Sequence, residues 1–216
     1  VISVFDRGFL MADAVYEVTS VLDGKLLEFD GHLKRLKRSL SELDMQEPDA
    51  INDLLEIHRT LVRDNQVDQG GVYLQVTRGV ADRDFIYPEN VKSTLVMFTQ
   101  SKDILGSKLV EKGMKVISID DLRWGRRDIK TVQLLYPSMG KMMAKSAKCD
   151  DAWMVEDGFV TEGTSNNAYI VVLISMRKGK GLKKISKSGN YFVQITRGTI
   201  LIFCVCIGVY SFTILG

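Results

Sequence analysis

Two tight-turn signals most constrain what this chain can fold into. They are Asp23-Gly24 and the run Glu156-Asp157-Gly158. The turns separate strand-like segments at residues 15–21 and 26–29, and at residues 151–155 and 159–161. Asp-Gly tolerates the positive φ angles that a short hairpin turn requires. Each signal therefore predicts two neighbouring antiparallel strands.

Helical patterns lie between these hairpins. Asp30 is a candidate N-cap for a helix that ends near Met45. Leucines recur within it at spacings of three and four, at Leu33, Leu36, Leu40 and Leu43. Further helices are predicted over residues 48–65, with Pro48 in the first turn, and over residues 138–148. Further strands are predicted over residues 71–78, 93–99, 115–120 and 168–173. Few helices with antiparallel strands indicate the α+β class.

The composition excludes several kinds of site. The formal net charge is +2, which gives no reason to expect a nucleic-acid partner. Three cysteines and two histidines lack metal-ligand spacing, so we expect neither a metal site nor a disulfide scaffold. The first residues have neither the basic segment nor the cleavage site of a signal peptide. Because Val1 is not Met, we expect the natural N-terminus upstream.

The charge distribution changes abruptly near Val172. Every acidic residue lies at or before Glu162, whereas seven basic residues follow Val172 without an acidic one. The last 19 residues, 198–216, carry no charge. One explanation is a transmembrane tail over residues 199–215, since such a run just spans a bilayer and basic residues precede it. The other, which we favour, is a frame error that replaced the natural C-terminal sequence. A membrane is expected as a partner only if this tail is genuine.

Two segments carry residues typical of chemistry, and neither is specific alone. Asp128-Ile129-Lys130-Thr131 contains a lysine that, without context, is expected to be solvated. The run from Thr161 to Asn167, with Glu162 as its one acid, has the composition of an ordinary turn. Its functional alternative is a loop that binds an anion or a cofactor.

Together with other motifs, these segments resemble the fold-type IV aminotransferases, which depend on pyridoxal 5′-phosphate (PLP). That family includes D-amino-acid transaminase, branched-chain transaminase and aminodeoxychorismate lyase. The resembling motifs are residues 5–9, 13–18, 30–36, 76–79, 87–90, 128–131 and 161–167. The resemblance covers about residues 1–171. It implies an N-terminal α/β-sandwich domain over 1–120 and the start of a PLP-binding, incomplete β-barrel-like C-terminal domain over 121–171. Residues 172–216 would be a divergent tail.

The resemblance assigns cofactor-binding roles to individual residues. Lys130 matches the lysine whose amine binds PLP covalently and then transfers a proton. Glu162 matches the carboxylate that stabilises the protonated pyridine nitrogen, and Arg35 the arginine that binds the phosphate. The loop of residues 161–167 places Ser165 and Asn166 at the cofactor. A second loop, residues 194–197, places Ile195 and Thr196 there. At that last loop Gln194 replaces the family's glycine.

Substrate recognition is assigned in the same way. Arg83 matches the arginine that binds the substrate carboxylate in D-amino-acid transaminases, and Tyr16 matches its tyrosine partner. Phe85 stands where those enzymes have a histidine, so the carboxylate trap differs from theirs. His32 is expected to be structural, with its ring near the cofactor. Arg126 and Arg127 are expected to be structural or to support the residues that bind the cofactor.

The resemblance implies transamination between an amino acid, expected to be a D-amino acid such as D-alanine, and a 2-oxo acid. Arg123-Trp124 and the run from Arg126 to Lys130 favour the D-amino-acid branch. The alternatives are branched-chain transamination, the lyase reaction that releases pyruvate, and a truncated, membrane-tethered pseudoenzyme. A cytoplasmic homodimer with active sites shared across its interface is expected from the family.

Overall fold

The computed structural model describes residues 1–107, 109 and 112–166, and the backbone of four short strands beyond them. The described part of the chain forms two compact units. Unit 1 comprises Val1–Ile104 and Trp124–Leu134, and unit 2 comprises Leu105–Arg123 and Leu135–Gly216. The predicted domain boundaries at residues 120 and 171 stay a prediction.

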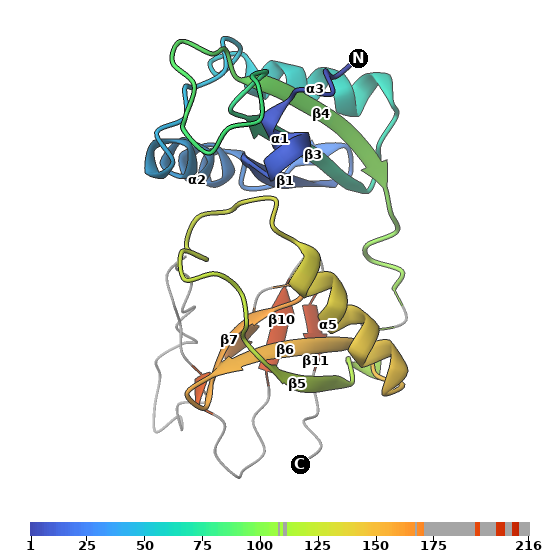
Figure 1. Ribbon diagram of the computed structural model, residues 1–216. Helices are drawn as coiled ribbons and strands as arrows, with labels where there is room; N and C mark the ends of the chain where they lie inside the picture. Colours follow the sequence, from blue (N-terminus) through green and yellow to red (C-terminus); the bar gives the residue numbers. More distant parts are fainter. Residues whose placement is uncertain are drawn as a thin grey trace, which may run out of the picture. The chain divides into compact units, whose positions relative to one another are not determined.

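Unit 1 is built on a four-stranded antiparallel sheet (Figure 1). Its strand order is β2-β1-β3-β4. The strands are β1 (Ala14–Leu22), β2 (Lys25–Leu26), β3 (Gly70–Thr77) and β4 (Thr94–Ser101). The turn between β1 and β2 has positive φ at both Asp23 (49°) and Gly24 (67°), as the Asp-Gly signal predicts.

Two helices, α2 (Phe29–Glu42) and α3 (Leu54–Asp64), pack on one face of this sheet. Side chains alternate between the faces of a strand, so Val15 and Leu74 point toward the helices. They form a core with Val76 of β3, with Ile129 and with apolar residues of both helices, among them Leu36, Leu40 and Leu54. The opposite face carries the less buried residues of the strands.

Two local predictions for unit 1 were wrong, and one short helix was not predicted. The first predicted helix begins at Phe29, so Asp30 lies in its first turn instead of acting as the N-cap. Residues 48–53 form turns, with Ile51 N bonded to Pro48 O, and α3 begins only at Leu54. The helix that was not predicted is α1 (Arg7–Met11), which Asp6 caps by accepting a hydrogen bond from Gly8 N.

Unit 2 contains a second four-stranded sheet of order β5-β6-β7-β9. Its elements are β5 (Val116–Asp120), α5 (Leu135–Ser146), β6 (Asp151–Glu156), β7 (Phe159–Gly163) and β9 (Val193–Gln194). A three-stranded sheet contains β8 (Ala168–Ile170), β10 (Ile202–Val205) and β11 (Val209–Ser211). The hairpin of β6 and β7 turns at Asp157-Gly158, both with positive φ.

Helix α5 packs closely on the second sheet through small residues. Ala144 and Ala152 are fully buried between the helix and β6. A Cβ at Gly140 would lie 2.9 Å from the Ile119 side chain and 3.0 Å from that of Thr164. Glycine at this position therefore permits the close contact between helix and sheet.

The α+β class is confirmed, although one strand pair differs from the antiparallel expectation. Strands β5 and β6 are parallel, with Val116 opposite Asp151. Thirty residues and a helix separate them, so no hairpin turn determines their direction. Among the described residues, no helix is both long and apolar enough to cross a bilayer. The predicted apolar tail at 199–215 lies largely outside the described residues.

Candidate functional site

Lys130 lies on a segment that extends the edge of β1. Because β2 is only two residues long, it covers the edge of β1 at Val21 and Leu22 alone. Residues 130–132 bind the opposite end of that edge: Tyr16 N donates to Lys130 O over 3.0 Å, and Val132 N donates to Ala14 O over 3.2 Å. A backbone fixed in this way orients the lysine side chain.

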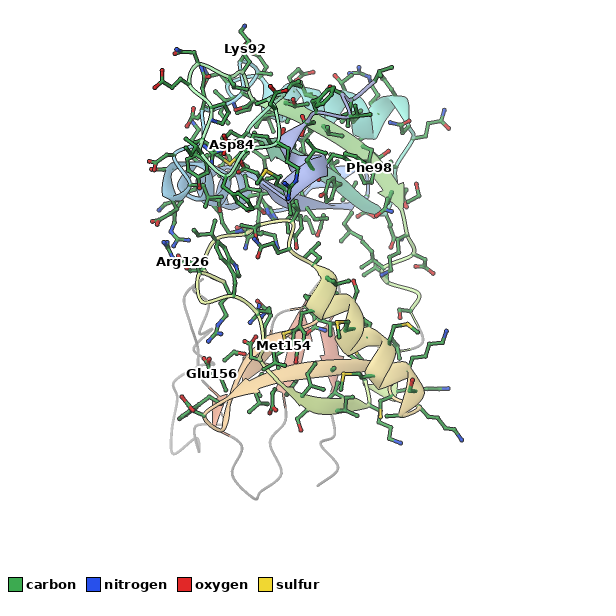
Figure 2. All side chains as sticks on the ribbon, in the orientation of Figure 1. Asp84, Lys92, Phe98, Arg126, Met154 and Glu156 are labelled. Carbon is green, nitrogen blue, oxygen red and sulfur yellow. The ribbon has the colours of Figure 1, made fainter. Side chains whose placement is uncertain are left out.

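Ion pairs hold the same segment against α2. Arg38 donates to the Asp128 carbonyl over 2.9 Å and to its carboxylate over 2.6 Å. Arg126, labelled in Figure 2, bonds both Asp128 and Glu42. The pKa of Asp128 is lowered, mainly because its carboxylate accepts hydrogen bonds from Arg126. The arginine expected to be structural is therefore part of the support for Lys130.

The amine of Lys130 faces an aromatic surface. Its Nζ donates to Tyr16 Oη over 3.1 Å and lies 4.3 Å from the centre of that ring. Tyr16 stacks on Tyr73 with ring centres 5.7 Å apart, and Tyr73 stacks on Phe98 at 4.8 Å. Burial raises the pKa of Tyr73. Among the described side chains, no carboxylate forms an ion pair with Lys130.

Arg35 is held by a buried carboxylate on the other face of β1. Glu17 is 1% exposed. It accepts from Arg35 Nε and NH2, each over 2.6 Å, and from His32 Nδ1 over 2.7 Å. Burial raises the pKa of Glu17, but the bonds from Arg35 and His32 outweigh it and hold that pKa below 4.5. An ionised Glu17 thus orients the guanidinium that sequence analysis assigned to phosphate.

Arg83 lies away from β1, on the exposed loop between β3 and β4. Its Cζ is 5.7 Å from the Phe85 ring centre, and Phe85 is 80% exposed. Within the described part of this chain, no hydrogen bond or cation–π contact joins Arg83 to Tyr16. The predicted carboxylate trap is therefore not assembled by contacts within unit 1 alone.

Glu162 belongs to unit 2, where strand β7 positions it opposite Met154. Arg123 NH1 lies 3.5 Å from its carboxylate, which is 41% exposed. Arg123 also bonds Asp121 over 2.7 Å and 2.9 Å. Burial raises the pKa of Asp121, but the bonds from Arg123 outweigh it and lower that pKa strongly. A fixed arginine thus stands beside the predicted pyridine partner.

The remaining predicted cofactor residues lie beyond the end of β7. Ser165 is exposed, whereas Asn166 donates to the carboxylate of Asp151, which is fully buried. Lys141 pairs with the same carboxylate over 2.8 Å. These contacts fix the turn after Glu162. Ile195 and Thr196 lie outside the described residues.

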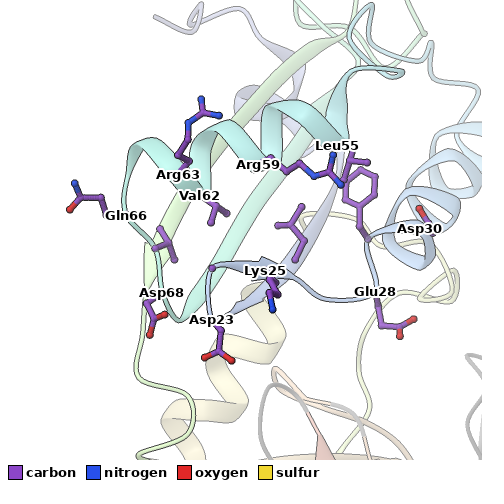
Figure 3. Close-up of a pocket in the computed structure, with 14 residues that line it drawn as sticks. Asp23, Lys25, Glu28, Asp30, Leu55, Arg59, Val62, Arg63, Gln66 and Asp68 are labelled. Atoms are coloured by element: carbon purple, nitrogen blue, oxygen red, sulfur yellow. The ribbon is translucent and has the colours of Figure 1, made fainter.

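A separate hollow of about 860 Å³ opens in unit 1 and contains none of the predicted site residues. Figure 3 shows it between the turn at Asp23, the start of α2 and one side of α3. Asp68 and Lys25, of opposite charge, lie on its rim. In the part of the chain that the structure describes, no cluster of three His, Cys, Asp or Glu side chains could hold a metal ion.

Sequence analysis assigned no role to Glu17, Tyr73, Arg123 or Asp121. A signal existed for Glu17, because strand alternation places this acid on the same face as Val15 and Thr19, which predicts burial with a cationic partner. No comparable signal marks Tyr73. It meets Tyr16 only because β3 pairs with β1, and that pairing joins residues more than fifty positions apart.

Comparisons with known proteins identify the family and the fold. The family model described as "Amino-transferase class IV" matches residues 14–174. D-alanine aminotransferase of Staphylococcus aureus (strain N315) is 36% identical over 171 residues, covering 79% of this chain and 60% of that protein. The chain therefore spans about 60% of the length of the curated relatives it matches.

Solved structures share the fold at lower identity. The branched-chain amino acid aminotransferase of Escherichia coli has a TM-score of 0.66 at 15% identity, covering 79% of this chain and 58% of its own. The 4-amino-4-deoxychorismate lyase of Pseudomonas aeruginosa has a TM-score of 0.64 at 20% identity, covering 80% and 64%. The predicted fold-type IV architecture is thus confirmed. Class IV aminotransferases are PLP-dependent enzymes. Since the family model matches well over half of the chain, this protein belongs to the class IV aminotransferases.

Proposed function

We propose that this protein transfers the amino group of a D-amino acid, such as D-alanine, to a 2-oxo acid, with PLP as its cofactor. The observation that carries the proposal is the Lys130 amine, which points at the Tyr16 hydroxyl instead of at a carboxylate. The choice of D-alanine is supported by relatives named D-alanine aminotransferase at 36% identity. Structural neighbours whose names give other activities are 15–23% identical.

The described residues fit PLP by their chemistry. An amine must react with the cofactor aldehyde, and Lys130 offers one that is fixed on the edge of β1. A dianionic phosphate needs a rigid cation, and Arg35 is oriented by Glu17. A pyridinium needs a carboxylate, and Glu162 is held on β7 beside Arg123. When bound, PLP would supply the electron sink that stabilises negative charge at the substrate Cα.

In this proposal the chain's own residues move protons and orient groups. The Lys130 Nζ would take a proton from one carbon of the bound reactants and return it to another. Tyr16 Oη, 3.1 Å away, would orient that amine by accepting its hydrogen bond. The Glu162 carboxylate would hold a proton on the pyridine nitrogen. Ser165, Asn166, Ile195 and Thr196 would add contacts at the phosphate end.

Substrate binding is assigned to Arg83 and Tyr16. Arg83 would pair with the substrate carboxylate through its guanidinium. Since Arg83 and Tyr16 do not touch within the described part of one chain, we further propose that a homodimer brings them together. The cytoplasmic location expected from the family stays a prediction. Light scattering tests the dimer, since a monomer at micromolar concentration would contradict it.

The reaction is tested with purified protein loaded with PLP. Three amino donors distinguish the alternatives: D-alanine with 2-oxoglutarate, L-leucine with 2-oxoglutarate, and aminodeoxychorismate alone. We expect D-glutamate from the first pair and no activity for Lys130→Ala. Pyruvate released from aminodeoxychorismate would instead assign the lyase reaction, and glutamate formed from L-leucine would assign branched-chain transamination. No product from any of the three would contradict the proposal.

A further inference from the structure

The loop that carries Arg83, residues 79–90, is exposed and yet tied down at its start. Arg7 N donates to Gly79 O over 2.9 Å, and Ala81 N donates to Phe5 O over 3.2 Å. Gly79 has a φ of 112°, and a Cβ there would lie 2.1 Å from the Lys92 carbonyl oxygen. The loop therefore leaves β3 along one defined path. Beyond residue 81, the path of the loop backbone depends on the contacts that the loop makes with Arg7 and Arg78.

Those contacts come from a buried cluster of three charged side chains. Asp13 Oδ2 accepts from Arg7 Nε over 2.7 Å and from Arg78 Nε over 2.8 Å. The side chains of Asp13, Arg7 and Arg78 are only 11%, 2% and 6% exposed. Two guanidinium groups on one carboxylate leave an excess positive charge. A charge buried in this way is stable only if further polar groups surround it.

Backbone carbonyls from two directions supply those groups. Arg78 NH1 and NH2 donate to the carbonyls of residues 44 and 43, at the end of α2, over 2.9 Å and 2.8 Å. Arg7 NH1 donates to Asp84 O over 2.6 Å. Asp84, labelled in Figure 2, directly follows Arg83. One arginine of the cluster thus binds the backbone beside the proposed substrate arginine.

An aromatic ring covers the cluster from the loop side. Arg78 Cζ lies 3.5 Å from the centre of the Tyr87 ring, and Arg7 Cζ lies 6.0 Å from it. Tyr87 itself is 50% exposed, so burial alone stabilises its ring only in part. The stacking of Tyr87 on the desolvated Arg78 guanidinium therefore contributes much of the interaction energy that fixes the loop near residue 87.

We propose that Arg7, Asp13, Arg78 and Tyr87 form a loop anchor that positions Arg83 for the substrate carboxylate. None of the four touches the substrate in this scheme, so they are positioning residues. This assignment rests on the proposed function, because the binding of a substrate carboxylate by Arg83 is itself part of that proposal. The anchoring of the loop itself can be measured without any reaction.

The test uses Tyr87→Ala in the full chain, with Tyr87→Phe as the matched control that keeps the ring over Arg78. Hydrogen exchange of the peptide spanning residues 79–90 reports loop opening, and the α3 peptide serves as an internal reference. We expect exchange of the loop to rise roughly 3- to 30-fold in Tyr87→Ala, the range of a cation–π contact. Tyr87→Phe should exchange like the parent chain. Equal exchange in the parent and Tyr87→Ala would overturn the anchor.

Kinetics then tests the link to Arg83. We expect Tyr87→Ala to raise KM for D-alanine more than it lowers kcat, and to have little further effect in an Arg83→Ala background. Full additivity of the two changes would overturn the link. If the parent chain proves inactive with every donor, the proposed function fails, while faster loop exchange in Tyr87→Ala would still support the anchor.

Discussion

Glu17 and Asp13 of unit 1 each bind two basic side chains, and these two clusters differ strongly in their exposure to solvent. Glu17 binds His32 and Arg35, and that arginine is 43% exposed. Asp13 binds Arg7 and Arg78, which are 2% and 6% exposed. In the Glu17 cluster a buried acid presents a cation to solvent. In the Asp13 cluster the cations are enclosed and bond to backbone carbonyls.

The difference separates two uses of the same chemistry. A half-exposed guanidinium held by a buried acid keeps a fixed orientation and stays accessible to a small anion. An enclosed pair of guanidinium groups can bind only protein groups and therefore fixes backbone segments. The Glu17 cluster thus suits ligand binding, and the Asp13 cluster suits the support of a loop.

The largest effect is expected from breaking the enclosed cluster. Asp13→Asn keeps the side-chain volume but leaves two buried guanidinium groups without a counter-charge. We expect a loss of about 3–5 kcal/mol in the free energy of unfolding, measured by urea denaturation. Asp49→Ala, which removes an exposed pair with Lys92, is the control and should cost less than about 1 kcal/mol. Similar losses for both variants would contradict the contrast between enclosed and exposed pairs.

A smaller loss is expected for Glu17→Gln, because water can solvate Arg35 once its partner is neutral. We expect about 1–3 kcal/mol at neutral pH. The folded-state pKa of Glu17 lies below its usual 4.5, so its stabilising effect is present above that pH and is lost as pH falls through the folded pKa. The gap between the parent and the variant should therefore narrow in acid. A gap that widens below pH 4.5 would contradict the assignment.

The smallest effect on stability is expected on the opposite face of β1. Tyr16→Phe removes the hydroxyl next to Lys130 and keeps the stack on Tyr73. We expect less than about 1.5 kcal/mol of destabilisation, the value of one hydrogen bond. Transamination should fall by roughly tenfold, because the amine loses its orientation. A variant as active as the parent would show that the 3.1 Å contact has no part in the reaction.

The sequence predicts those parts of the fold that short segments determine. Asp23-Gly24 and Asp157-Gly158 specify their hairpins because each turn needs only its own residues to accept positive φ. The leucine spacing likewise predicts α2. The starts of α2 and α3 were predicted wrongly. At each start, several residues could begin the helix, and the sequence pattern does not show which backbone hydrogen bonds form first along the chain.

The site was predicted less completely, because its support comes from distant segments. Lys130 was assigned by resemblance from several motifs together, and its role stays a prediction. Its position on the edge of β1 depends on the short length of β2, and no local sequence pattern predicts that length. Asp13 meets Arg78 across 65 positions through the pairing of β1 with β3. Charged residues that meet in this way look like ordinary surface residues in the sequence.

The most direct test of the account is the covalent attachment of PLP at Lys130. The purified chain is incubated with PLP, reduced with borohydride and digested, and the modified lysine is located by mass spectrometry. Lys145→Ala, which removes an exposed lysine on α5, serves as the control. We predict one stoichiometric adduct on Lys130 in the parent and in Lys145→Ala, and none in Lys130→Ala. An unmodified Lys130, or a label spread evenly over exposed lysines, would contradict the account.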